Sequence, residues 1–149
     1  MQKQTFLAIL VLAAVMSCAR ILTVSAAVEE VDVVVNKTNV VSSLSREELR
    51  KIFMGEKNSW PGGKHITVLM LEKGQPERQL ILREVYKMNE SDYTKYFLQA
   101  AFTGRVQAAP RDLSSTAEMK TRLAANPNAI GYLKQEDVDN SVRVLLKIP

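Results

Sequence analysis

The feature that most constrains the fold is the alternation of short β-branched runs with helical segments. Val31–Asn36 (VDVVVN) and Ile66–Leu71 (ITVLML) are apolar runs typical of buried strands. Ala129–Leu133 (AIGYL) and Ser141–Ile148 (SVRVLLKI) have the same character near the end of the chain. Strands that alternate with helices predict an α/β domain of three layers, a small and mostly parallel sheet flanked by helices. Because a single helical segment separates the first two runs, we expect a right-handed parallel crossover between them.

The first helical segment has clear signals at both of its ends. Ser45 is placed to cap it, and Glu48 three residues later completes a capping box. Leu44 and Leu49 have the spacing of a hydrophobic staple, and Gly55 suits the C-terminal stop. The sequence therefore predicts a helix between Ser45 and Gly55.

Three further helices are predicted. The first covers Pro76–Lys87, with proline in the first turn, where its missing N–H is tolerated. The second is expected to be capped by Ser91 and to end at Gly104, and the third to begin with a capping box of Ser115 and Glu118. The expected buried faces are Leu80, Ile81, Val85 and Met88 in the first helix, and Tyr93, Tyr96, Phe97, Ala100 and Ala101 in the second.

The N-terminal segment has the pattern of a secretory signal. A basic residue at Lys3 precedes the apolar run Phe6–Met16 and the small residues VSAA, so we expect cleavage after Ala26 or Ala27. The run is shorter than the ~20 residues of a membrane span. Cys18 follows it as a candidate lipid-attachment residue, although Met16 fits that pattern poorly. We expect residues 28–149 to form one domain, periplasmic or secreted, without a stable membrane span after cleavage.

The charge pattern argues against nucleic acid as a partner. Loss of Lys3 and Arg20 from the 20 basic residues leaves 18, against 16 acidic residues, so the mature chain carries a formal charge of +2. These charges are interleaved, as in SREELRK, and form no basic block. The single cysteine, Cys18, lies in the expected signal, so no disulfide is expected after cleavage. With one histidine, His65, and no cysteine, a metal site is not expected either.

The order of three motifs resembles a known family. VVVNKTNVVSSLSREELRKIFMGEKNSWPGGKHITVLM is followed by FTGR and then by NPNAIGYL. In this order they resemble one lobe of the substrate-binding proteins of phosphate-type ABC transporters, in the periplasmic binding protein-like superfamily, over about residues 31–133. The resemblance implies a type II periplasmic binding protein-like fold, an exported protein, and phosphate or another oxyanion as ligand.

The length of the mature chain departs from this family. Full-length members clamp the ligand between two lobes, whereas residues 28–149 provide for one lobe. A single lobe leaves its ligand open to water, and the lost contacts weaken binding. Capture at high affinity is therefore expected to need a dimer, a partner lobe or another protein.

A second departure concerns the turn EKGQPER, residues 72–78. In the family, small and hydroxylated residues of the corresponding turn let backbone amides and hydroxyls reach the phosphate. Here Pro76 has no N–H to donate, and Glu77 brings negative charge to the anion position. One interpretation is a residual anion cradle; the other, which the sequence favours, is a structural turn into a helix. The candidate ligand-binding residues are Lys73, Gly74, Gln75 and Arg78.

Other candidate sites are weaker. Arg105 and Arg111, in GRVQAAPRD, are secondary candidates for an anion or for a partner's carboxylate, although exposed loop arginines are usually solvated. His65 is expected to be an exposed loop residue. Trp60 is either a partner anchor or packed against its own domain. No nucleotide loop or nucleophile elbow is present.

These patterns predict a non-enzymatic binding protein without a cofactor. The first hypothesis is an exported solute-binding module, for phosphate or another oxyanion, that serves a transport or sensing system. The alternative is a periplasmic module that has lost its ligand and binds a protein, such as a transporter, a sensor or an envelope protein.

Overall fold

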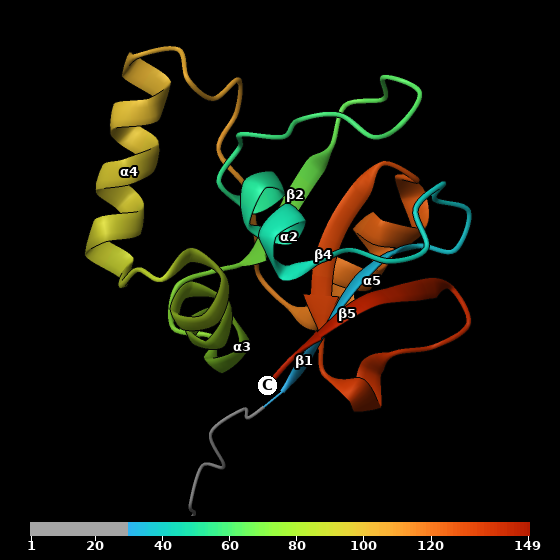
Figure 1. Cartoon of the computed structure of the whole chain (residues 1–149). Helices are drawn as coiled ribbons and strands as arrows, with labels where there is room; N and C mark the ends of the chain where they lie inside the picture. Colours follow the sequence, from blue (N-terminus) through green and yellow to red (C-terminus); the bar gives the residue numbers. More distant parts are fainter. Residues whose placement is uncertain (1–29) are drawn as a thin grey trace, which may run out of the picture.

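Residues 30–149 are described by the computed structural model (Figure 1), and the expected signal segment lies outside them. Five strands form one sheet in the order β3–β2–β4–β1–β5. The strands are β1 (Val31–Asn36), β2 (Thr67–Leu71), β3 (Arg111–Leu113), β4 (Ala129–Leu133) and β5 (Val142–Ile148). Each of the four predicted strands is present, and β3 is an addition that the sequence did not indicate.

The sheet is mixed. β2 pairs in parallel with β3 and β4, whereas β1 pairs antiparallel with both β4 and β5. Four strands therefore run in one direction, and only β1 opposes them. The expected parallel crossover from β1 to β2 is wrong, because β4 lies between these strands and β1 runs the other way. The handedness rule applies only to parallel strands of a crossover unit, and local sequence does not reveal that a late strand takes the intervening place.

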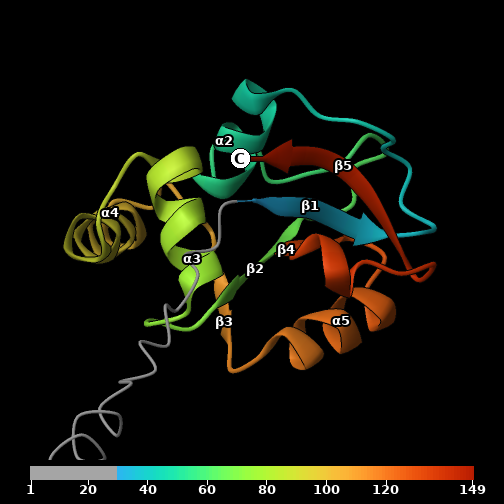
Figure 2. The same ribbon diagram turned by 90° about the horizontal axis from the view of Figure 1, so that it is seen from below.

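Helices cover both faces of the sheet. The helical elements are α2 (Arg46–Phe53), α3 (Pro76–Ile81), the π-helical turn η2 (Leu82–Tyr86), α4 (Glu90–Phe102), α5 (Thr116–Ala125) and the 3-10 turn η3 (Gln135–Asp137). α5 packs on one face, α2 and α3 lie on the other, and α4 stands outside α3 (Figure 2). The predicted three-layer α/β arrangement is confirmed. Within residues 30–149, no helix is long and apolar enough to cross a bilayer.

The start of α2 agrees with its sequence signals. The Glu48 backbone N–H donates to Ser45 Oγ at 3.2 Å, and the Ser45 N–H donates to a Glu48 carboxylate oxygen at 3.0 Å. Leu44 and Leu49 are both buried. This reciprocal cap satisfies two backbone donors that a helix otherwise leaves unpaired.

Three helix predictions need correction. The capping box expected at the start of α5 is half formed, because Ser115 Oγ accepts from the Glu118 N–H at 3.2 Å but the Glu118 carboxylate accepts from the Ser114 N–H. α4 is capped by Asn89, whose side-chain oxygen accepts from the Asp92 N–H at 2.9 Å, and Ser91 lies inside the first turn. Ala101 is exposed, because only a narrow face of α4 touches the domain. The predicted helix Pro76–Lys87 is α-helical to Ile81 and then widens into the π-helical turn η2.

Aromatic side chains join the outer helix α4 to the domain. The Tyr86 ring in η2 lies 5.0 Å from that of Tyr93, 6.2 Å from that of Phe97 and 5.8 Å from that of Phe53, measured between centroids. All three pairs have the edge-to-face geometry that aromatic quadrupoles favour. α2, η2 and α4 are thereby held together.

The structure decides between the two interpretations of Trp60 and confirms the prediction for His65. Trp60 is only 2% exposed, and its indole N–H donates to the Asn128 carbonyl at 3.0 Å. It packs against its own domain, so the partner-anchor alternative is wrong. His65 is exposed, as expected.

Candidate functional site

The predicted turn lies at the edge of the sheet where three parallel strands end. β2 ends at Leu71, β3 at Leu113 and β4 at Leu133. Residues 72–75, here named the β2–α3 turn, lead from β2 into α3. In open α/β sheets, ligands bind at the carboxyl ends of the strands. This edge is therefore the part of the sheet at which a binding site is expected.

Arg78 lies beneath the turn and is only 3% exposed. Its Nε and Nη2 atoms donate to the two carboxylate oxygens of Glu90 at 2.6 and 3.1 Å. Its Nη1 atom donates to Asp112 Oδ1 and to the Leu71 carbonyl, both at 2.8 Å. The guanidinium also stacks over the Tyr93 ring, 4.9 Å from its centroid. One side chain thus connects α3, α4, β2 and β3.

The positive charge of the buried Arg78 is compensated by carboxylates of its own chain. Burial opposes its charge, but the hydrogen bonds and charges of Glu90 and Asp112 raise the pKa of Arg78 above its ordinary value. Burial also raises the pKa of the neighbouring Tyr93 to about 12. Bidentate arginine–carboxylate pairs are among the strongest charged contacts in proteins. An incoming anion would have to displace a carboxylate to reach this guanidinium.

Glu77 is also buried and paired. It is 5% exposed, and one of its carboxylate oxygens lies 3.1 Å from the Nζ atom of Lys134, which directly follows β4. The hydrogen bond and charge of Glu77 raise the pKa of Lys134. Sequence reasoning recognised the negative charge of Glu77 but missed Lys134. The position of Lys134 just after the AIGYL strand was the available signal, because parallel strands end at one edge.

The remaining candidate residues of the turn face outward. Lys73 and Gly74 are exposed, and Gln75 is partly exposed and caps α3 without a side-chain hydrogen bond. Gly74 has a φ of +98°, which favours glycine, and apart from its two chain neighbours no residue has an atom within 4 Å of the place a Cβ would occupy. The shape of the predicted turn is present. Its four candidate residues are divided, with Arg78 directed into the domain and Lys73 at the surface.

The secondary candidates Arg105 and Arg111 lie elsewhere. Arg105 follows α4, is exposed, and has its guanidinium 5.9 Å from the centroid of the Tyr96 ring. Arg111 is exposed at the start of β3, opposite Leu69 and before the strands reach the edge with the turn. Within residues 30–149 no three histidine, cysteine or acidic side chains gather as metal ligands would.

Several solved structures described as phosphate-type binding proteins share this fold. No family model matches the sequence, and no curated protein matches it at a significant level. A Clostridium perfringens protein described as a phosphate ABC transporter substrate-binding protein, with bound phosphate, matches 77% of this chain with a TM-score of 0.63 and 20% identity. An ABC-type phosphate transport receptor from Vibrio cholerae (TM-score 0.56, 24% identity) and PstS from Borrelia burgdorferi (TM-score 0.58, 15% identity) also match 77% of it.

These matches cover 43%, 44% and 46% of the three proteins, so this chain spans less than half of their length. The described residues have the fold of about one lobe of a phosphate-type substrate-binding protein, and the resemblance drawn from the sequence motifs is confirmed at this level. Identities of 24% and below establish the fold alone. The phosphate belongs to the Clostridium perfringens structure, and the ligand of this chain has to be argued from its own residues.

Proposed function

We propose that this protein is a non-enzymatic binding module of the cell envelope that contacts another protein and does not capture a free oxyanion. The observation that carries the proposal is the state of Arg78, whose guanidinium binds Glu90, Asp112 and a backbone carbonyl of its own chain. A phosphate at the β2–α3 turn would have to compete with both carboxylates, and it would also meet Glu77. The turn has the shape of an anion site, but the buried Arg78 guanidinium beside it forms hydrogen bonds that stabilise the fold.

A surface on α4 supports a protein partner. Leu98 and Phe102, here named the α4 patch, are 60% and 86% exposed and lie one helical turn apart. Adjacent large apolar side chains in water mark interaction surfaces more often than isolated ones do. Residues 94–105 include Lys95 and Arg105 and no acidic residue. The complementary partner surface is apolar and rimmed by carboxylates.

The N-terminal sequence supports an extracytoplasmic localisation. Residues 1–27, outside the described part of the chain, have the basic start, apolar run and small residues of an export signal. We infer a periplasmic or secreted protein, so that the partner is a transporter, a sensor or another envelope protein.

Site-specific photo-crosslinking in living cells tests the protein contact. A benzophenone amino acid at position 102 is expected to give one defined covalent adduct, which weakens when Lys95→Glu reverses the neighbouring charge. The matched control is position 121, because Thr121 is exposed on α5, on the other face of the sheet. The same adducts from both positions, or none from position 102, would contradict the proposal.

A second candidate function is weak oxyanion binding at the β2–α3 turn. It is favoured by the exposed Lys73 and by the open backbone at Gly74. Contact with one surface lysine is weak and screened by salt, because water surrounds the pair.

Titration with phosphate separates the two candidates. We expect millimolar phosphate to cause no localised NMR shifts in the purified protein, beyond those caused by chloride at the same ionic strength. Lys73→Ala is expected to leave this response unchanged. Shifts that cluster at residues 73–78, exceed those with chloride and vanish in Lys73→Ala would instead establish the oxyanion site.

A further inference from the structure

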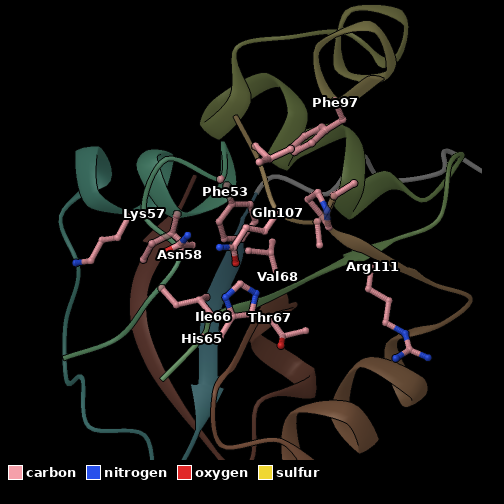
Figure 3. Close-up of a pocket in the computed structure, with 16 residues that line it drawn as sticks. Phe53, Lys57, Asn58, His65, Ile66, Thr67, Val68, Phe97, Gln107 and Arg111 are labelled. Atoms are coloured by element: carbon pink, nitrogen blue, oxygen red, sulfur yellow. The ribbon is translucent and has the colours of Figure 1, made fainter. Parts of the chain in front are cut away.

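A cavity of about 210 Å³ lies away from the β2–α3 turn, where β2 and β3 begin (Figure 3). The end of α2, the first residues of β2 and the loop 106–110 before β3 surround it. It is partly open to solvent. Neither the α4 patch nor the turn residues 72–75 belong to its lining.

The inner wall of the cavity is apolar and held in place. Phe53 and Val106 are buried, and Val68 and Phe97 complete the wall. The loop is fixed where Val106 packs on Gly55, since a Cβ added to Gly55 would lie only 2.6 Å from Val106 Cγ1. The cavity therefore has a defined shape, as ligand sites generally do.

The mouth of the cavity carries amide and imidazole groups. The side chains of Asn58, His65 and Gln107 lie around it (Figure 3), and none of them makes a hydrogen bond to another residue within the range 30–149. The charged ends of Lys57 and Arg111 point away from the cavity in the same view. Lys57 is directed to Glu48, with 3.8 Å between Nζ and a carboxylate oxygen. The lining includes no acidic residue.

We propose that this cavity binds a small uncharged molecule with an apolar ring and one amide-like polar group. The ring would lie against Phe53, Val68 and Phe97, and the polar group would hydrogen bond to Asn58 and Gln107. An apolar cavity of roughly 150 Å³ holds benzene, so the present volume suits a ring with one substituent. A carboxylate held against Phe53, Val68 and Phe97 is disfavoured, because it would lose hydration while the charged ends of Lys57 and Arg111 point away from it.

Two probes of equal shape test the class of ligand. Benzamide, titrated into the purified protein, is expected to shift the NMR signals of residues 65–68 and 106–109. Benzoate, which differs mainly in its charge, is expected to bind at least several-fold more weakly. No localised shift with millimolar benzamide, or tighter binding of benzoate than of benzamide, would overturn the proposal.

Variants test the location. Val68→Phe is expected to abolish the benzamide response by filling the cavity. Gln107→Ala, on the surface loop, is expected to weaken benzamide binding several-fold without loss of folding. If Val68→Phe does not fold, the benzamide affinity of Gln107→Ala tests the location alone. Gln79→Ala, exposed on α3 outside the cavity, is the matched control and should bind benzamide like the unchanged protein. Equal benzamide affinity in Gln107→Ala and Gln79→Ala would contradict the proposed polar contact.

Discussion

Arg78→Ala is expected to lower the free energy of unfolding by about 3–5 kcal/mol, as removal of one partner from a buried ion pair does. The change leaves Glu90 without its bidentate partner, Asp112 without an ion pair, and the Leu71 carbonyl without a donor. It also removes the cation that stacks over Tyr93. Urea unfolding followed by circular dichroism measures the loss.

Two further variants make the experiment specific. Arg78→Lys keeps the charge but cannot form the planar fork to Glu90, so an intermediate loss is expected. Arg83→Ala breaks an exposed pair with Glu84 and is expected to cost roughly 0–1 kcal/mol. If Arg78→Ala cost no more than Arg83→Ala, the guanidinium would not be tied to the fold, and the oxyanion function would have to be reconsidered.

The sequence predicted the shape of the turn but not the partners of its arginine. Gly74 and Pro76 carry local backbone signals, and the structure has the positive φ and the helix start that they indicate. The partners of Arg78 are Glu90, 12 residues later, and Asp112, 34 residues later. Their meeting depends on the docking of α4 and β3, which local patterns do not encode.

The fold predictions succeeded for features set by neighbouring residues and failed for contacts between residues far apart in the sequence. The capping box of Ser45 and Glu48 spans four residues, and it was predicted in full. The place of β4 between β1 and β2 depends on pairing of Val35 with Ile130, far apart in the chain. β1 is buried along its whole length. Its apolar sequence therefore indicates a strand covered on both sides, but it does not indicate which strands pair with it.

β4 is the strand on which this arrangement depends. It occupies the middle of the five-stranded sheet, paired with β1 on one side and β2 on the other. Ile130 is opposite Val35 in β1 and Val68 in β2, and its side chain is fully buried. If the side chain of residue 130 were shortened, the space it left would be surrounded by packed side chains of several elements. These side chains have little room to move in and fill that space.

Ile130→Ala is therefore expected to cost about 2–5 kcal/mol, through lost burial and an unfilled cavity. Ile130→Val removes a single methylene and is expected to cost roughly 0.5–1.5 kcal/mol. Val40→Ala serves as the control, because Val40 is 71% exposed and buries little surface. Urea unfolding of the three variants should give this order of losses. A loss for Ile130→Ala as small as that for Val40→Ala would mean that residue 130 is not in the sheet core, and that the lobe is not built around β4.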